Sequence, residues 1–307
     1  MAFSAQDVKN LREMTGVGMM DCKKALTEAD GDIDKACDWL REKGLAAAQK
    51  KAGRIAAEGV AYADVFDGIG VVVEVNAETD FVAKNDLFNE FVKNVALVVA
   101  KENPADLTAL FACKYPGTEL TVEQMQSEKV LVIGENIKVR RYVRYETGVC
   151  VPYVHMGGRI GVIINMDVPA GNESKDEVIG LGKDLAMQIA AMNPAYRDKS
   201  DVDQSVLDKE KEILMIQAKE DPKNASKPEA IIEKMVVGRV SKFYEENCLL
   251  QQAYVKGDKI TVEQHIAEIS KAIGAKITIT GFTRFEKGEG IEKKQDDFAA
   301  EIASLVK

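Results

Sequence analysis

The chain has 307 residues, of which 46% are hydrophobic and 30% charged, and its formal net charge is −9. A chain of this length is expected to form two or three domains, each with its own core. The negative charge argues against a nucleic-acid binder that relies on phosphate contacts. The longest apolar runs, such as residues 95–100, are too short to span a bilayer, so no membrane contact is expected.

The cysteine pattern predicts a reducing compartment. The five cysteines contain no CxxC pair, and they are Cys22, Cys37, Cys113, Cys150 and Cys248. An odd number of scattered cysteines does not suggest a disulfide framework, and the N-terminus MAFSAQDVKN lacks the pattern of a secretory signal. The sequence therefore predicts a cytoplasmic protein.

Residues 1–45 predict three short helices. Ser4, followed by Asp7 three positions later, is typical of a helix N-cap, and two glycines in TGVGMM (15–20) end the first pattern. We expect Asp21 to open the second helix. A unit of this size has a very small core and is marginal alone, so residues 1–45 are expected to serve as a partner-docking module.

The third of these helices is expected to stop at Gly44, because glycine often follows the last residue of a helix. The alanine-rich stretch that follows gives residues 46–58 the composition of a linker, either helical or extended.

Beyond the linker, the chain resembles itself. Three pairs of segments correspond in the same order: 58–75 with 147–166, 92–104 with 182–194, and 133–146 with 273–286. Ordered self-similarity of this kind indicates two copies of one supersecondary unit. Each copy is expected to contain a β-hairpin, a helix ending at Asn-Pro, a connection and a returning strand. The predicted class is α+β with two antiparallel sheets.

The repeat sets the expected boundaries of the core. The first subdomain is predicted at 59–146, and the second at 147–195 and 247–286. The second copy contains about fifty extra residues, so 196–246 is predicted to be an inserted helical hairpin, with Pro228 in the first turn of its second helix. Such a hairpin either packs on a partner or on its own twin, or is a self-contained decoration.

The C-terminal module is predicted at 287–307. Residues 296–306 form an amphipathic pattern that predicts a C-terminal helix, with its apolar side at Phe298, Ile302 and Leu305.

The chain offers little for catalysis. Its two histidines, His155 and His265, have no cysteine, aspartate or second histidine at a metal-binding spacing, so no metal site is expected. GLGKD (180–184) resembles a phosphate loop but lies inside a predicted helix. Glu78 and Asp80 could form a paired-carboxylate site, but no nucleophile or cofactor motif accompanies them. We therefore expect neither an enzyme nor a bound cofactor.

Phe81 is the most informative single residue. It follows the strand 71–75 in a polar connection, ETDFVAKND, whereas the matching stretch of the second copy, PAGNESKDEV (169–178), has no aromatic residue. An aromatic needed to fix the helix entry would be expected in both copies. Phe81 is therefore predicted to be an exposed recognition residue.

Several of these segments also carry a family resemblance. They are TGVGMMDCKKAL (15–26), ETDFVAKND (78–86), IGENIKVRR (133–141), HMGGRIGV (155–162), EKMVVGRVSKFYEEN (233–247) and GFTRFEKGEGIEKK (281–294). Together they resemble bacterial elongation factor Ts, the guanine nucleotide exchange factor of elongation factor Tu. The resemblance implies a ubiquitin-associated-like N-terminal module, two related subdomains, a helical hairpin that forms a homodimer, and a C-terminal module.

The resemblance also implies partner contacts. Residues matching the loop that acts near the Mg²⁺ site of elongation factor Tu are Thr79, Asp80, Phe81 and Val82. Other positions that match the partner-facing side are Met19, Met20, Lys23, Ile133, Gly134 and His155. The alternative function is an adaptor that binds a partner through the N-terminal helices without causing nucleotide exchange.

Overall fold

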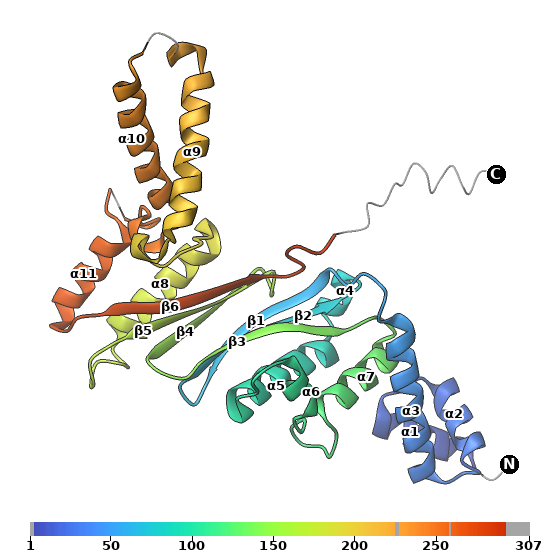
Figure 1. Cartoon of the computed structure of the whole chain (residues 1–307). Helices are drawn as coiled ribbons and strands as arrows, with labels where there is room; N and C mark the ends of the chain where they lie inside the picture. The colour runs from blue at the N-terminus through green and yellow to red at the C-terminus, as the bar shows by residue number, and fades with distance from the viewer. Residues whose placement is uncertain (1–2, 225–226, 258, 293–307) are drawn as a thin grey trace.

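The computed structural model describes residues 3–224, 227–257 and 259–292 (Figure 1). Its first three helices are α1 (Ala5–Thr15), α2 (Met19–Glu28) and α3 (Ile33–Lys51). The predicted cap of α1 is confirmed, because Ser4 and Asp7 form a reciprocal capping box. The three helices enclose a small core around Leu11 and Leu26.

Two expected helix boundaries are wrong. The second helix begins at Met19 rather than at Asp21, and the third continues past Gly44 to Lys51. Alanine-rich sequence favours helix, so GLAAAQKK extends the third helix instead of ending it. Gly44 serves close packing: a Cβ at this position would lie 3.3 Å from the carbonyl oxygen of Ser127.

The first sheet has the antiparallel order β1-β2-β3. Its strands are β1 (Glu58–Phe66), β2 (Ile69–Ala77) and β3 (Lys138–Tyr145). The connection from β2 to β3 contains four helices: α4 (Asp80–Ala83), α5 (Asp86–Glu102), α6 (Leu107–Ala112) and α7 (Val122–Ile133).

The second sheet has the antiparallel order β4-β5-β6. Its strands are β4 (Val149–His155), β5 (Ile160–Asp167) and β6 (Thr278–Glu286). Its helices are α8 (Asp176–Met192), α9 (Gln204–Glu220), α10 (Glu229–Asn247) and α11 (Val262–Ile273), with short 3₁₀ turns η1 (Lys199–Asp201), η2 (Pro222–Asn224) and η3 (Leu249–Gln251). The α+β class, with two antiparallel three-stranded sheets, is confirmed.

The two copies agree in detail. Helices α5 and α8 each have 17 residues, and both end at an asparagine in the left-handed conformation, Asn103 and Asn193, each with φ of 46°. Helices α7 and α11 each have 12 residues and the same Thr-to-Gln capping box. The tetrapeptide TVEQ opens both helices, at 121–124 and 261–264, with its threonine as the N-cap.

The two sheets pack face to face, with α5 and α8 on the outer faces. Small side chains make this contact: Ala61 and Ala63 of the first sheet lie against Ile163 and Phe285 of the second. Gly161 permits the close approach, because a Cβ there would lie 2.8 Å from the carbonyl oxygen of Ala61. The result is a four-layer core of helix, sheet, sheet and helix.

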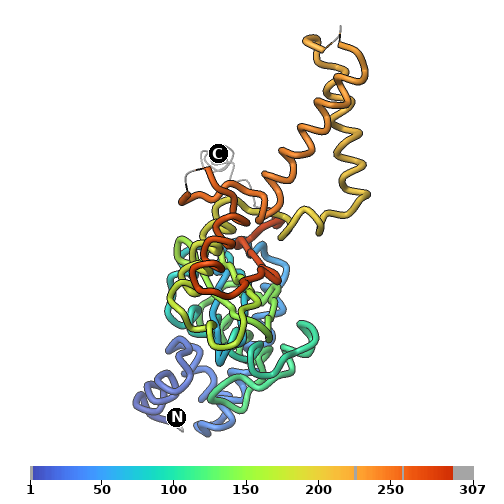
Figure 2. The backbone as a smooth tube through the Cα atoms, turned by 90° about the vertical axis from the view of Figure 1, so that its left-hand side faces the viewer, coloured from blue at the N-terminus to red at the C-terminus, as the bar shows by residue number. Residues whose placement is uncertain are grey.

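The inserted hairpin projects from this core. Helices α9 and α10 run side by side away from the sheets in both views (Figures 1 and 2), and Ile232 and Val236 are buried in their contact. Pro228 is the N-cap of α10, one position before its first turn. The predicted C-terminal helix at 296–306 lies outside the described residues. Among the residues that are described, no helix is long and apolar enough to cross a membrane.

Candidate partner-binding site

The loop between β2 and α5 presents Phe81 to solvent. Thr79 has an extended backbone, with φ of −125° and ψ of 159°, and the short helix α4 follows it. Successive residues of a helix point about 100° apart, so one of two neighbours can be buried while the other faces solvent. Val82 turns inward and is 6% exposed, whereas Phe81 is 78% exposed. The predicted exposure of Phe81 is confirmed; its role in recognition stays a prediction.

The loop is held in place on both sides of Phe81. The backbone N–H and the hydroxyl of Thr79 donate to the carboxylate of Glu135, at 3.0 and 2.7 Å. The N–H of Asn136 donates to Glu78 at 2.6 Å. On the other side, the side chain of Asn89 donates to the carbonyl of Ala83 at 3.0 Å. A loop whose backbone is already anchored loses little backbone entropy when a partner binds it.

The carboxylates of Glu78 and Asp80 have separate partners. Glu78 accepts from Asn136 and lies 3.4 Å from Arg54, while Asp80 lies 3.5 Å from Lys84 on the surface. Exposed pairs such as the second contribute little to stability. The two groups therefore do not form the shared acid–base pair considered above.

Ile133 and Gly134 lie beside this loop. They end α7 immediately before Glu135, so the bonds from Thr79 bring the two predicted segments together. Ile133 is half-buried against the core, and Gly134 ends the helix with φ of 86°. The carbonyl of Gly134 accepts from Lys51 at 2.5 Å, which ties the end of α3 to the same place.

His155 lies in the hairpin between β4 and β5. Its Nδ1 is 2.9 Å from the hydroxyl of Tyr153. The hairpin is fixed to the first sheet, because the N–H of Ala61 donates to the carbonyl of Gly158 at 2.8 Å. Since Ala61 is near the start of β1, which pairs with the end of β2, the hairpin and α4 occupy the same end of the first sheet (Figure 1).

The remaining predicted contacts lie on α2. Met19 and Met20 are 54% and 75% exposed in its first turn, and Lys23 is exposed one turn later. Figure 1 places α2 beyond α3, on the side away from α4. These residues therefore form a surface separate from the loop.

Sequence reasoning missed two exposed apolar side chains at the Phe81 end. Met156, next to His155, is 69% exposed and has a φ of 47°, and Ile55 is 49% exposed beside Arg54. The signal for Met156 was present: the HMGGR turn is two residues longer than its counterpart in the first copy. Ile55 carried no such signal, because it stood in a stretch interpreted as a linker.

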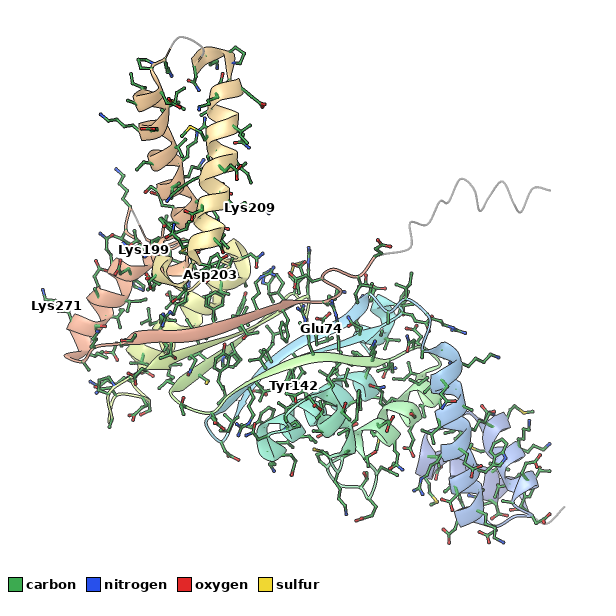
Figure 3. The ribbon with its side chains drawn as sticks, in the orientation of Figure 1. Glu74, Tyr142, Lys199, Asp203, Lys209 and Lys271 are labelled. Carbon is green, nitrogen blue, oxygen red and sulfur yellow. The ribbon has the colours of Figure 1, made fainter. Side chains whose placement is uncertain are left out.

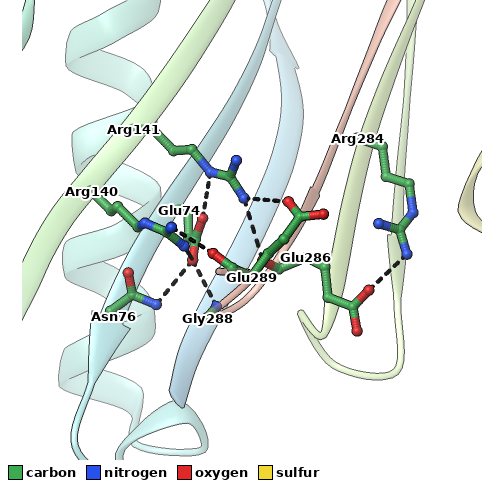
Figure 4. Close-up of polar contacts among 8 residues, drawn as sticks. All are labelled: Glu74, Asn76, Arg140, Arg141, Arg284, Glu286, Gly288 and Glu289. Carbon is green, nitrogen blue, oxygen red and sulfur yellow. Dashed lines mark hydrogen bonds and ion pairs between the residues drawn. The ribbon is translucent and has the colours of Figure 1, made fainter. Parts of the chain in front are cut away.

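A buried ionic cluster lies in the strand that leads to the loop (Figure 4). Glu74 of β2 is fully buried, and its carboxylate accepts from Arg140 at 2.9 Å and from Arg141 at 2.6 Å. The N–H of Gly288, beyond β6, donates to the same carboxylate at 2.8 Å. Burial alone would raise the pKa of Glu74, but hydrogen bonds from Gly288, Asn76 and the two arginines outweigh it and lower that pKa. The cluster attaches residues 286–289 to the first sheet.

Comparison with known proteins identifies the family. A family model described as Elongation factor TS matches residues 78–289. The chain belongs to the elongation factor Ts family. Elongation factor Ts of Syntrophotalea carbinolica is 48% identical over 309 residues, covering 100% of both chains. That of Clostridium perfringens is 49% identical over 307 residues, covering 99% of each. That of Magnetococcus marinus is 46% identical over 308 residues, covering 100% of this chain and 99% of the relative.

Membership of the elongation factor Ts family supports a role in translation elongation, that is, in protein biosynthesis. Within the described residues, no group of three or more histidine, cysteine, aspartate or glutamate side chains could hold a metal ion.

Proposed function

We propose that this member of the elongation factor Ts family is a guanine nucleotide exchange factor that acts by binding rather than by chemistry. It binds GDP-bound elongation factor Tu, disturbs the Mg²⁺ and phosphate site, and promotes GDP release so that GTP can bind. The observation that carries this proposal is the 78% exposure of Phe81 on a loop anchored at both ends.

Thermodynamic linkage sets how much differential binding energy the loop has to supply. If this protein weakens the hold of its partner on GDP, GDP weakens the hold of the partner on this protein by the same factor. Each tenfold loss of nucleotide affinity takes about 1.4 kcal/mol of differential binding. Burying one phenylalanine side chain supplies roughly 1.5–3 kcal/mol. If Phe81 fits only a rearranged partner, one ring accounts for about one to two powers of ten.

Val82 has a different part in this proposal from the one that the resemblance implied. Its side chain is 6% exposed and packs in the core of its own subdomain. We therefore assign it the positioning of Phe81, and leave the direct contacts to Thr79, Asp80 and Phe81. Ile133, Gly134 and His155 lie at the same end of the molecule and are proposed to extend that contact.

The proposal is tested by GDP release. Elongation factor Tu loaded with a fluorescent GDP is mixed with excess unlabelled nucleotide, with and without this protein, in a stopped-flow instrument. Accelerated release is expected. Binding of the partner without any acceleration would favour the adaptor, which docks through Met19, Met20 and Lys23 of its ubiquitin-associated-like helices and leaves the nucleotide in place.

We further propose that the inserted hairpin forms a homodimer. Its exposed apolar side chains support this: Ile213, Ile216, Ile231 and Val237 are 40%, 50%, 46% and 70% exposed. Ile216→Glu is expected to shift the protein towards monomer in sedimentation velocity. The neighbouring exposed Gln217→Glu adds the same charge and is the matched control. A wild-type protein that is monomeric at micromolar concentration would contradict the dimer.

A further inference from the structure

The internal repeat shows which surface of the second copy lacks a covering helix. Helices α7 and α11 are equivalent, since both are opened by TVEQ and both end at a left-handed glycine, Gly134 and Gly274. One side of α7 is covered by α3 of the N-terminal helices. The same side of α11 lines an open groove.

The contact of α3 with α7 uses small residues. Gly44 lies directly over the backbone of Ser127, and Ala48, four residues later, packs against the first core. Basic residues flank this stripe: Arg41 lies 3.8 Å from Glu128, and Lys51 donates to the carbonyl of Gly134 at 2.5 Å. Small residues four apart let two helices approach closely, and a cation at the C-terminal end of α7 complements the helix dipole.

The groove on α11 is built from the corresponding positions. The TVEQ register pairs Ser127, Leu131 and Gly134 of α7 with Ala267, Lys271 and Gly274 of α11. All three of the α11 residues line a groove of about 770 Å³. Its floor is apolar and comes from α11, β6 and η3: Leu250, Ile266, Ile277 and Ile279.

This side of α11 faces solvent. Ala267 and Lys271 are exposed, and Figure 3 shows Lys271 at the outer edge of the molecule. Glu268, at the position of Glu128, is 63% exposed, so it is accessible to a basic residue of an arriving helix.

The described part of the chain after α11 runs away from the groove. The nine residues of β6 lead away from α11 and carry the chain roughly 27 Å from it at about 3.3 Å per residue. The ionic cluster then attaches residues 286–289 to the first sheet. By analogy with α3, which covers the same side of α7, we take the occupant to be a helix of another molecule.

We propose that the groove between α11 and β6 docks one amphipathic helix of a partner protein with the chemistry of α3. That helix presents two small residues four apart to Ala267, one basic residue to Glu268, and another to the carbonyl end of α11. The contact is independent of Phe81 and adds a second docking surface to the proposed exchange function.

A peptide with the sequence of α3 tests this proposal. Residues 33–51 are synthesised with Cys37→Ser, a fluorophore, and a staple on the face opposite Gly44 and Ala48, so that the helix is formed before binding. Fluorescence anisotropy with the full-length protein is expected to show binding. Ala267→Arg fills the groove and is expected to weaken binding about tenfold or more, equivalent to about 1.4 kcal/mol.

Two controls make the result decisive. Ala105→Arg places the same side chain at an exposed position of the first copy that does not line the groove, and is expected to leave binding unchanged. A peptide with Gly44→Leu and Ala48→Leu has a strong helix former at both positions but lacks the small stripe, and is expected to bind at least about tenfold more weakly. Failure of the stapled wild-type peptide to bind at millimolar concentration would overturn the proposal. So would equal effects of the two arginine variants.

Discussion

The two strand-to-helix connections of the core occupy equivalent places in the two copies but differ in their side chains. Between β2 and α5 the first copy contains α4, with Val82 buried and Phe81 exposed. Between β5 and α8 the second copy has turns around Gly171 and Asn172 and no aromatic residue. Since α8 forms with the same length as α5, the ring is not required for the fold. The exposed ring of Phe81 is therefore a difference between the copies that the fold itself does not require.

The two sheets also differ in the polar residue that is buried at their register shifts. Strands β2 and β5 both have a register shift in their pairing, at Glu74/Val75 and at Asn165/Met166. At the first shift a buried glutamate holds two arginines and the N–H of Gly288. At the second, Asn165 accepts a weak bond from Cys150 at 3.4 Å. The ionic cluster is thus specific to the copy that carries Phe81.

The largest effect on stability is expected from replacing Glu74 by asparagine, the residue that the second copy has at the equivalent register shift. Glu74→Asn removes the carboxylate and leaves Arg140 and Arg141 without their buried partner. Loss of one member of a fully buried pair costs about 3–5 kcal/mol; because both arginines are partly exposed, we expect about 2–3 kcal/mol in urea unfolding. Glu119→Asn, which breaks the exposed pair with Lys114, is the control and should change little. Equal values for the two variants would contradict the account of the cluster.

A smaller effect is expected at Val82. Val82→Ala removes two buried methyl groups, and at about 0.8 kcal/mol for each the unfolding free energy should fall by roughly 1.5–2 kcal/mol. Because Val82 positions Phe81, GDP release should slow at the same time. Val178→Ala, which makes a similar change at a buried position of α8 in the second copy, tests whether the slowing is specific to the loop. If both variants slow release equally, Val82 has no special positioning role.

The pH dependence of stability is expected to reflect Glu74. Its pKa in the folded protein is below the ordinary value of 4.5, so the carboxylate stabilises the fold above that value. This contribution is lost as pH falls through the lowered pKa. The difference in unfolding free energy between the wild type and Glu74→Gln should therefore be largest near neutral pH and shrink below about pH 4. A difference that does not change with pH would show that the charge of Glu74 is unimportant.

Most of the architecture could be predicted from local patterns. The repeat gave the two sheets and the Asn-Pro ends of α5 and α8, and the length of the insertion gave α9 and α10. The error at Gly44 arose because a glycine that ends a helix and one that admits a neighbouring helix look alike in sequence. The tetrapeptide TVEQ, repeated at 121–124 and 261–264, also carries the information that α7 and α11 are equivalent.

The candidate site was harder to predict. The resemblance implied that 79–82 and 133–134 both face the partner, but the link between them is the side chain of Glu135, which is 56 residues from Thr79. The attachment of Gly288 to Glu74 spans 214 residues. Contacts of this range depend on how the two sheets pack, and no local pattern records them.

The central claim is that burial of Phe81 in the partner promotes nucleotide release and adds little to the affinity for the partner. Stopped-flow release of fluorescent GDP from elongation factor Tu, at saturating concentrations of wild type and Phe81→Ala, tests it most directly. Val255→Ala, which truncates another exposed side chain, is the control. The account predicts that Phe81→Ala slows release by about 10- to 100-fold, with unfolding free energy unchanged within about 0.5 kcal/mol. Release as fast as with the wild type would contradict it.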